Sequence, residues 1–405
     1  MVRGGMRARA SLWLGWCAAL VVAAGGCRRE APRAEVQLWH TFDPAEAATL
    51  GRALAGAPVR AATRGVAFER AQNVLRAALE RGGDECPDVA RVDAAWIPGL
   101  ARRGLLAEAP PELLSGAAVE PAAAALAEYE GRRYGVAQTF GCLAVIERGG
   151  GGGASGGGGA SGGAVRTLDE LGQRLVDGCV AADADGGPRC GVALEADGFW
   201  ALPWIFAEGG ALVDPAARTG SIDEAPAQRA LGRLAALARG RALADDPVAA
   251  LARGELPLVV EGPWVLGRLG GAEVRVTAFP AAPDGQPSAP VVGQIWVVGR
   301  CSREPARAWR LVEHLVSAPV AARFARETFA PPALVSARGE APAVVQAFVA
   351  ACPARTLPRH EISSALFDDL TPAVGAVLRG EATPAEALVD VARGWRRRLA
   401  ALEAP

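Results

Sequence analysis

Aromatic rings and hydrogen-bonding side chains near the ends of apolar segments are the residues of this sequence best suited to bind a molecule. The stacking candidates are Trp39, Trp200, Trp264 and Trp296, with Trp96 and Phe367 behind them. The hydrogen-bonding candidates are His40, Thr41, Asp93, Gln138 and Gln294. Flat rings cover apolar C–H faces, while carboxylates and amides form paired bonds with hydroxyls. This combination indicates noncovalent binding of a hydroxyl-rich molecule.

Each of these candidates also has a structural alternative. A ring in an apolar run is equally a core residue, and His40 is equally compatible with a half-buried structural histidine. Asp43 precedes Pro44, so it either caps the following helix or faces the bound molecule. The sequence leaves these pairs of roles open.

The sequence offers little for covalent catalysis. All 43 basic residues are Arg, which excludes a Schiff-base lysine and a Walker-type phosphate loop. The three His residues lie in no motif, and Ser155 lies in a glycine-rich run instead of between a strand and a helix. No close pair of cysteines or cluster of histidines suggests a metal site. We expect no enzyme and no cofactor, although a pair of carboxylates that meet in space stays open.

The composition is that of a folded, nearly neutral protein. The 405 residues are 51% hydrophobic and 21% charged, with a net charge of −1. Wholesale disorder is excluded by this content, and the charge gives no electrostatic reason to expect a nucleic-acid partner.

Residues 1–26 predict an export signal. Arg3, Arg7 and Arg9 precede an apolar run at 11–24, which is shorter than the ~20 residues of a membrane span. Residues 22–27 (VAAGGC) resemble the bacterial lipobox, in which Cys27 becomes the acylated first residue. An ordinary signal peptide with an incidental Cys27 is the alternative. We expect an exported protein, lipid-anchored to a bacterial membrane and facing the periplasm or the cell exterior.

Cysteine usage agrees with export. Cys17 and Cys27 belong to the signal, which leaves six of the eight cysteines in the mature chain. An even number in an oxidising compartment predicts disulfides. Cys179 and Cys190 close a short loop and are the first pairing we expect.

The expected elements alternate between strands and helices. Strands are predicted at 35–40, 89–92 and 134–146, with a helix that starts at Pro44. The alternation continues to the C-terminus, which indicates α/β layers. Residues 149–163 (GGGGGASGGGGASGG) have no side chains to pack. We interpret this run as a loop insertion, because loops accept added length at small entropic cost.

Nine stretches, in order along the mature chain, resemble the extracellular solute-binding proteins of ABC importers, in the carbohydrate-binding group that includes maltose-binding proteins. They lie at 36–42, 86–106, 133–137, 167–171, 199–210, 253–264, 279–293, 304–309 and 382–388. The most distinctive is VEGPW at 260–264. Any one of these stretches is weak evidence, but nine in the family's order are strong evidence.

The resemblance implies an α/β fold of two lobes, joined by crossing hinge strands, with a C-terminal helical segment. It places lobe 1 at 27–136 plus 290–335 and lobe 2 at 137–289 plus 336–405. A solute, most simply a sugar or oligosaccharide, would bind between the lobes and pass to permease subunits in the membrane. It also adds Phe199 beside Trp200 and supports Trp264 and Phe367 as rings against the solute. We expect a monomer without catalytic activity.

The sequence also departs from that group. Gly141 falls where the maltose binders supply a carboxylate, so the resemblance implies a sugar without specifying maltose. A polyamine is an alternative solute, for which Asp43, Asp93, Glu195 and Asp197 are the available acids. A phosphorylated or organic anion is another, since Arg is abundant. A ligand-sensing receptor and a secreted hydrolase are the remaining alternatives.

Overall fold

The computed structural model describes residues 35–113, 118–149, 163–177, 192–214, 219–352, 359–365 and 369–403. Among the predicted features, Cys27, most of the glycine run, Cys179, Cys190 and Phe367 lie outside these residues. Residues Ala34–Pro405 form one compact unit. None of the helices in the described ranges is long and apolar enough to cross a membrane.

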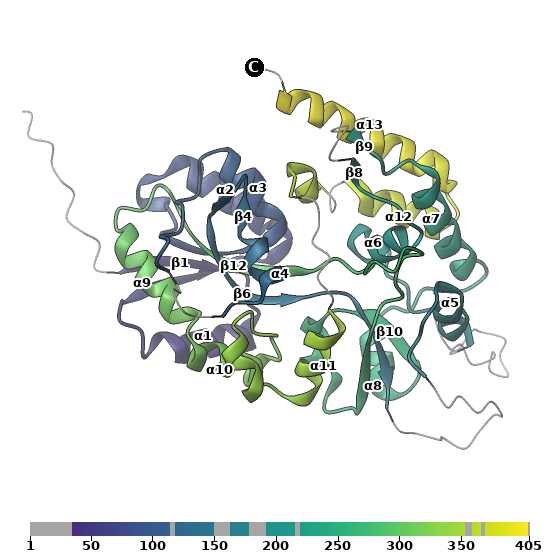
Figure 1. Cartoon of the computed structure of the whole chain (residues 1–405), viewed down its shortest axis with the longest axis horizontal. Helices are drawn as coiled ribbons and strands as arrows, with labels where there is room; N and C mark the ends of the chain where they lie inside the picture. The colour runs from purple at the N-terminus through teal and green to yellow at the C-terminus, as the bar shows by residue number, and fades with distance from the viewer. Residues whose placement is uncertain are drawn as a thin grey trace, which may run out of the picture. The chain divides into compact units, whose positions relative to one another are not determined.

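The larger sheet has five strands in the order β2-β1-β3-β12-β6 (Figure 1). Their bounds are Ala61–Gly65 (β2), Val36–His40 (β1), Val89–Asp93 (β3), Val292–Val298 (β12) and Gly135–Gly141 (β6). β1 runs parallel to β2 and β3, whereas β12 runs antiparallel to β3 and β6. Every residue of β3 and β6 is buried, as expected of strands covered on both faces.

The smaller sheet has three antiparallel strands in the order β10-β7-β11. They are β10 (Leu258–Glu261), β7 (Ala144–Arg148) and β11 (Val274–Ala278). Residues 134–146, predicted as one strand-like stretch, are thus two strands in different sheets, separated by Cys142 and Leu143. The predicted lobe border at 136/137 falls inside β6, whose residues as far as Gly141 pair with β12 in the larger sheet.

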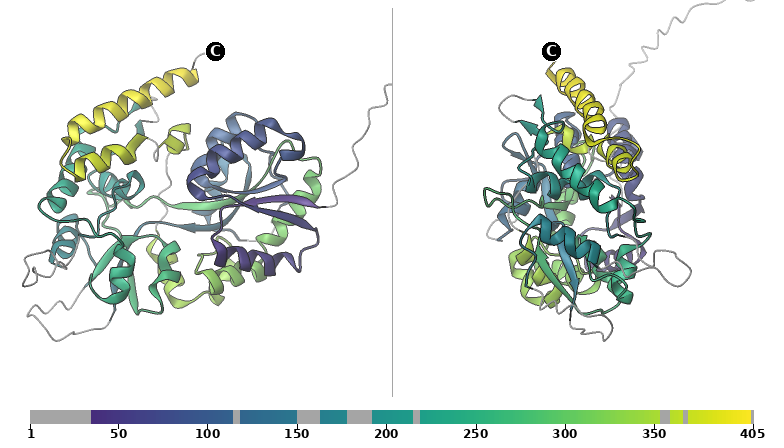
Figure 2. Two further views of the ribbon diagram at one scale, coloured as in Figure 1. Left: turned by 180° about the vertical axis from the view of Figure 1, so that it is seen from behind. Right: turned by 90° about the vertical axis from the view of Figure 1, so that its right-hand side faces the viewer.

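Helices cover both sheets. Around the larger sheet lie α1 (Pro44–Leu54), α2 (Phe68–Arg81), α3 (Ile97–Arg102), α4 (Pro121–Leu126), α9 (Pro305–Leu315) and α10 (Ala318–Thr328). With the smaller sheet lie α5 (Leu168–Asp177), α6 (Gly198–Ala207), α7 (Ala225–Ala238), α8 (Pro247–Arg253) and α11 (Ala343–Ala351). The C-terminal helices α12 (Thr371–Leu378) and α13 (Pro384–Glu403) pack on α7, as Figure 2 shows.

Short elements complete the fold. The single-turn and 3-10 helices are η1 (Gly83–Glu85), η2 (Ala94–Trp96), η3 (Pro263–Leu269), η4 (Val335–Glu340) and η5 (Glu361–Ala365). The two-residue strands are β4 (Glu128–Tyr129), β5 (Arg132–Arg133), β8 (Val213–Asp214) and β9 (Thr219–Gly220). Of these elements, η3 matters most for the site, because it carries Trp264.

Local sequence explains where α1 begins. The Asp43 carboxylate accepts from the backbone N–H of Glu46 (2.8 Å), and the Glu46 carboxylate accepts from the N–H of Asp43 (3.1 Å). With Pro44 in the first turn, this is a complete capping box. Of the two roles open to Asp43, the structure shows the helix cap.

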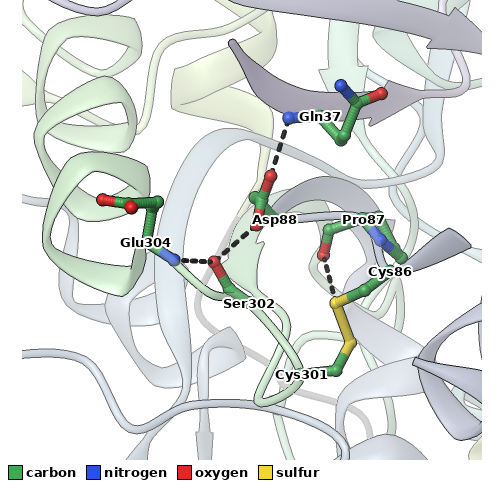
Figure 3. Close-up of a disulfide and its surroundings, with 7 residues drawn as sticks. All are labelled: Gln37, Cys86, Pro87, Asp88, Cys301, Ser302 and Glu304. Atoms are coloured by element: carbon green, nitrogen blue, oxygen red, sulfur yellow. Dashed lines mark hydrogen bonds between the residues drawn. A yellow bond between two sulfur atoms is a disulfide. The ribbon is translucent and has the colours of Figure 1, made fainter. Parts of the chain in front are cut away.

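Two disulfides confirm the prediction of disulfide bonding, in pairings that the sequence did not specify. Cys86–Cys301 joins the segment before β3 to the loop after β12. Beside it, Asp88 accepts from the N–H of Gln37 (2.8 Å) and from the hydroxyl of Ser302 (2.6 Å), as Figure 3 shows. These contacts tie β1, β3 and β12 together at one end of the larger sheet.

The second disulfide, Cys142–Cys352, lies where the chain passes between the sheets. Cys142 follows β6 directly, and Cys352 follows α11, which packs against β11 of the smaller sheet. The bond therefore attaches the crossing between β6 and β7 to a helix of the smaller sheet.

The glycine run is anchored at both ends. The N–H of Gly149 donates to the carbonyl of Glu273 (2.7 Å), and the carbonyl of Gly163 accepts from Arg174 (3.0 Å). Arg174 also pairs with Glu147, at the end of β7 (2.6 Å). Both ends of the run thus lie close to the end of β7, which supports the interpretation of the run as a loop insertion between β7 and α5.

Shortening this run is expected to change little. If residues 152–158 are deleted, which halves the run, the free energy of unfolding should change by less than about 1 kcal/mol, because halving a flexible loop changes its closure entropy by only about 0.6 kcal/mol. Urea denaturation and solute titration of the deletion variant measure both properties. Loss of solute binding in a folded variant would show that the run contributes to the site.

Candidate functional site

Strand directions bring most of the predicted polar residues to one edge of the larger sheet. β1, β3 and β6 point the same way. Thr41 and Asp93 lie at the carboxyl ends of β1 and β3, and Gln138, in the middle of β6, lies level with Asp93 across β12. β12 runs the other way and brings Gln294, near its start, opposite Asp93. Carboxyl ends of strands are where open α/β sheets bind ligands. We call Thr41, Arg91, Asp93, Gln138 and Gln294 the polar edge.

Arg91 organises the polar edge, and the sequence analysis missed it. Its Nε donates to Oε1 of Gln138 (2.7 Å), and a terminal nitrogen donates to the hydroxyl of Thr41 (3.1 Å). The guanidinium lies 4.1 Å from the centre of the Phe42 ring. Only 8% of the residue is exposed. A charged residue inside the apolar stretch VARVD was the signal that could have revealed it.

The charge of Arg91 persists despite its burial. Burial lowers the pKa of Arg91 to about 10, while Glu46, Asp93 and Asp43 act in the opposite direction. Among the described residues, no carboxylate oxygen lies within 4 Å of its guanidinium. Burial and the nearby Arg91 together lower the pKa of His40, so its imidazole is neutral at neutral pH. The Nδ1 of His40 accepts from the N–H of Phe42 (3.3 Å).

Asp93 and Gln294 contact each other. The Gln294 amide donates to Oδ2 of Asp93 (3.0 Å), and Oδ1 accepts from the N–H of Ala95 (2.8 Å). Two buried amide atoms of the polar edge, Nε2 of Gln138 and Oε1 of Gln294, have no hydrogen-bond partner within the described ranges. Unsatisfied buried polar atoms are rare and need an explanation, of which a bound solute is one.

The burial of Asp93 makes stability depend on pH. Burial raises the pKa of Asp93 from 3.8 to about 6. The folded state then holds a proton that the unfolded state releases, so stability falls as pH rises from about 4 to about 6. Between pH 4 and pH 7, the free energy of unfolding of the unliganded Asp93→Asn variant should fall by up to about 3 kcal/mol less than that of the parent protein. One pKa unit corresponds to ~1.36 kcal/mol. Denaturation at pH 4 and pH 7 measures it, with exposed Glu69→Gln as control. An unchanged pH slope would show that Asp93 is ionised in the folded protein.

Three of the predicted stacking rings are core residues. Trp296 is fully buried and packs edge-on against Phe42. Trp96 packs against Phe68, and Arg64 covers the ring of Trp39 at 4.2 Å. Because neighbouring side chains cover these rings, they do not present an open face to a solute. Trp39, His40, Thr41, Arg91 and Trp96 still line a small cavity beside the polar edge.

The other three aromatic candidates on described residues form one cluster. The ring centres of Phe199 and Trp200 are 5.4 Å apart, and those of Trp200 and Trp264 are 6.1 Å apart. Phe199 also lies 6.0 Å from Trp264. We call these residues the aromatic cluster. Phe199 is buried and Trp200 is half-buried, whereas Trp264 is 48% exposed.

Two glycines allow this arrangement. A side chain at position 262 would overlap the Trp264 ring, with Cβ only 2.1 Å from a ring carbon, so only glycine lets this ring fold back. A Cβ at Gly141 would lie 2.7 Å from the Pro263 ring. Gly141, which departs from the family pattern, is therefore where the end of β6 meets the start of η3. This contact places the start of η3, next to Trp264, against the end of β6.

Three acids lie beside the aromatic cluster, and we call them the acidic group: Glu195, Asp197 and Glu261. Asp197 caps α6 by accepting from the N–H of Phe199 (2.7 Å), and it accepts from the Thr371 hydroxyl (3.1 Å). Burial raises the pKa of all three, that of Glu261 to about 7. The described part of the chain holds no group of three or more His, Cys, Asp or Glu side chains suited to a metal ion.

Comparison with known proteins identifies the fold. The sequence matches no protein-family model and no curated protein. The structure resembles the GacH receptor of Streptomyces glaucescens GLA.O, solved unliganded and with acarbose, at a TM-score of 0.74 and 24% identity, over 90% of this chain and 98% of that one. It also resembles an ABC-transporter solute-binding protein of Thermotoga lettingae TMO bound with α-D-tagatose, with a TM-score of 0.73, 19% identity, and coverage of 91% of this chain and 100% of that one.

A third similar structure is the maltose/maltodextrin-binding domain MalE of Bdellovibrio bacteriovorus bound to maltotriose, with a TM-score of 0.74, 16% identity, and coverage of 90% of this chain and 100% of that one. These likenesses span nearly all of the chain, and they agree with the α/β fold expected from the sequence. The chain therefore has the two-lobed α/β fold of the solute-binding proteins of ABC transporters.

Proposed function

We propose that this protein is the solute-binding subunit of an ABC importer and that it captures a sugar or oligosaccharide. The observation that supports this most is the combination, within a solute-binding fold, of a polar edge and an aromatic cluster with one exposed ring. Hydroxyl-rich rings need both kinds of surface, because their C–H faces are apolar and their rims are polar.

In this proposal the polar edge binds hydroxyls and Trp264 covers a sugar face. The free amide atoms of Gln138 and Gln294 supply one donor and one acceptor. Arg91 holds Thr41 and Gln138 in place, so it is a positioning residue. Phe199 and Trp200 support Trp264 from behind. Phe367 is a further candidate to contact the sugar, because the resemblance to the family supports it as a ring against the solute.

Lobe closure would convert binding into a signal for transport. The two lobes would close on the solute. Lobe 1 comprises 27–136 plus 290–335, lobe 2 comprises 137–289 plus 336–405, and all of β6 is assigned to lobe 1. A permease then distinguishes the closed state from the open one. The protein acts as a monomer and is not an enzyme, since the transported solute leaves unchanged.

Export and anchoring complete the proposal. The signal at 1–26 directs the chain out of the cytoplasm, and Cys27 carries the lipid that holds it at the membrane. The two described disulfides favour an oxidising compartment. Cys27→Ala should move the protein from the membrane fraction to the soluble fraction. If the variant stayed in the membrane fraction, Cys27 would not be the anchor.

Thermal unfolding with candidate solutes tests the function. The mature domain, with Cys27 replaced, is heated with sugars, polyamines, amino acids and phosphorylated solutes. A solute at 100 times its Kd adds about 2.7 kcal/mol of stability. Stabilisation by a sugar supports the proposal. Stabilisation by a phosphorylated solute or an amino acid alone would keep the fold and overturn the carbohydrate assignment.

A further inference from the structure

The carboxylate of Glu261 is buried without a charged partner. Glu261 ends β10, and only 4% of the residue is exposed. Its Oε2 accepts from the N–H of Gly262 (3.2 Å), which is its only hydrogen bond to the described residues. No Arg or His nitrogen in the described ranges lies within 4 Å of it. A buried carboxylate in this position is costly unless something else compensates its charge.

The groups around Glu261 add negative charge. Burial and, after it, Glu195 raise the pKa of Glu261, while burial, Asp197 and Asp246 raise that of Glu195. The basic group that acts on Glu195 is Arg268, on η3, and its guanidinium is already paired with Asp246 (2.5 Å). The segment before α6, β10 and the cap of α8 thus contribute four acids. Two arginines act on them, Arg268 and Arg253, and Arg253 is itself paired with Glu255.

The aromatic cluster forms the wall of this acidic group. The Trp264 ring lies over Gly262, whose N–H donates to the Glu261 carboxylate, and Asp197 accepts from the N–H of Phe199. The Trp200 N–H is buried and has no partner in the described part of the chain. The exposed Trp264 ring offers its face beside the acids. Rings next to carboxylates bind organic cations, through ring quadrupole and charge together.

We propose that the acidic group and the aromatic cluster bind a protonated amine, so that the solute is an amino sugar or an oligosaccharide that contains one. This inference rests on the proposed function and names the substrate class of the same site. A protonated amine compensates the Glu261 charge, a hydroxyl-rich ring matches the polar edge, and an anionic solute would be repelled by the acids. A neutral sugar would leave the excess of acids over arginines uncompensated. A simple polyamine would leave the free amide atoms of Gln138 and Gln294 without hydroxyl partners.

A matched series of trisaccharides tests the proposal. Cellotriose, the trimer of N-acetylglucosamine and the trimer of glucosamine share one linkage and differ at the C2 substituent, and only the last carries amines that protonate near neutral pH. The titrations are run at pH 7.5, where the Glu261 carboxyl, with a pKa of about 7, is mostly ionised. Maltotriose, glucosamine and spermidine are titrated beside them by calorimetry. We expect the amine-bearing sugars to bind at least about tenfold more tightly than their neutral counterparts, because one charged contact is worth that much.

Two variants locate the effect. Glu261→Gln keeps the shape and removes the charge, so it should reduce the preference for the amine-bearing sugars to about threefold or less. Glu255→Gln is the matched control, because Glu255 is exposed on the turn before β10 and pairs with Arg253. The control should bind like the parent protein. Glu261→Gln should unfold at or above the parent's temperature, because it removes a buried charge that has no ionic partner among the described residues. Glu255→Gln should unfold close to it, since an exposed ion pair contributes little to stability.

The outcomes separate this inference from the proposed function. Equal or tighter binding of the neutral sugars would overturn the amine assignment and leave the sugar function standing. An amine preference that persists in Glu261→Gln would overturn the role of Glu261 and the inference with it. Binding of spermidine alone would overturn the sugar function while leaving an amine site, and binding of no probe would overturn the inference.

Discussion

Trp264→Ala is expected to weaken solute binding by about 1–3 kcal/mol, which is roughly five- to more than a hundredfold in Kd. Trp264 is the aromatic candidate with an exposed face, and Phe199 and Trp200 hold it from behind. Truncation removes both the stacking face and the wall beside Glu261. Because the ring is 48% exposed, the fold should lose less than a buried ring would cost.

Two further variants make this result interpretable. Trp264→Phe keeps an aromatic face and should recover part of the affinity, whereas Val389→Ala, an exposed apolar residue on α13, should leave affinity unchanged. Isothermal titration with the best solute from the thermal scan measures all three, and circular dichroism checks their folding. An unchanged Kd for a normally folded Trp264→Ala would remove this ring from the site.

Replacing Cys142 and Cys352 together by serine is expected to lower the free energy of unfolding by about 2–5 kcal/mol. The bond closes a loop with a sequence separation of 210 residues, for which the chain-entropy model gives about 5 kcal/mol. The bond also holds the crossing between β6 and β7 to the end of α11. Without it, binding must order a looser crossing, so affinity should fall by about two- to tenfold.

The other disulfide is a close control. Cys86–Cys301 has a sequence separation of 215 residues, so Cys86→Ser with Cys301→Ser should cost about as much stability. Its cysteines flank β3 and β12 within the larger sheet, away from the crossing. This pair should therefore leave affinity within about twofold of the parent. Urea denaturation and titration of both double variants separate the two effects, and equal affinities would show that the crossing disulfide only stabilises.

The site was partly predictable from the sequence. The sequence predicts Asp93 and Gln294 as candidates to bind hydroxyls, and the structure places them in contact although they are 201 residues apart. Trp296 was predicted to lie near the end of a strand and to stack on a solute, yet it lies inside β12, fully buried against Phe42. Arg91 and Glu261 were not among the predicted candidates. A charge in an apolar strand indicates a buried charged residue, but the residues that it contacts depend on the tertiary structure.

The sequence by itself determined the α/β alternation, the start of α1 at Pro44 and the presence of disulfides. Each of these depends on a few adjacent residues, whose propensities and periodicity act locally. Only the tertiary structure decided which cysteines pair, which tryptophans are covered, and that the acids gather beside the rings. Those outcomes depend on strand register and packing between segments about 200 residues apart, which no local pattern records.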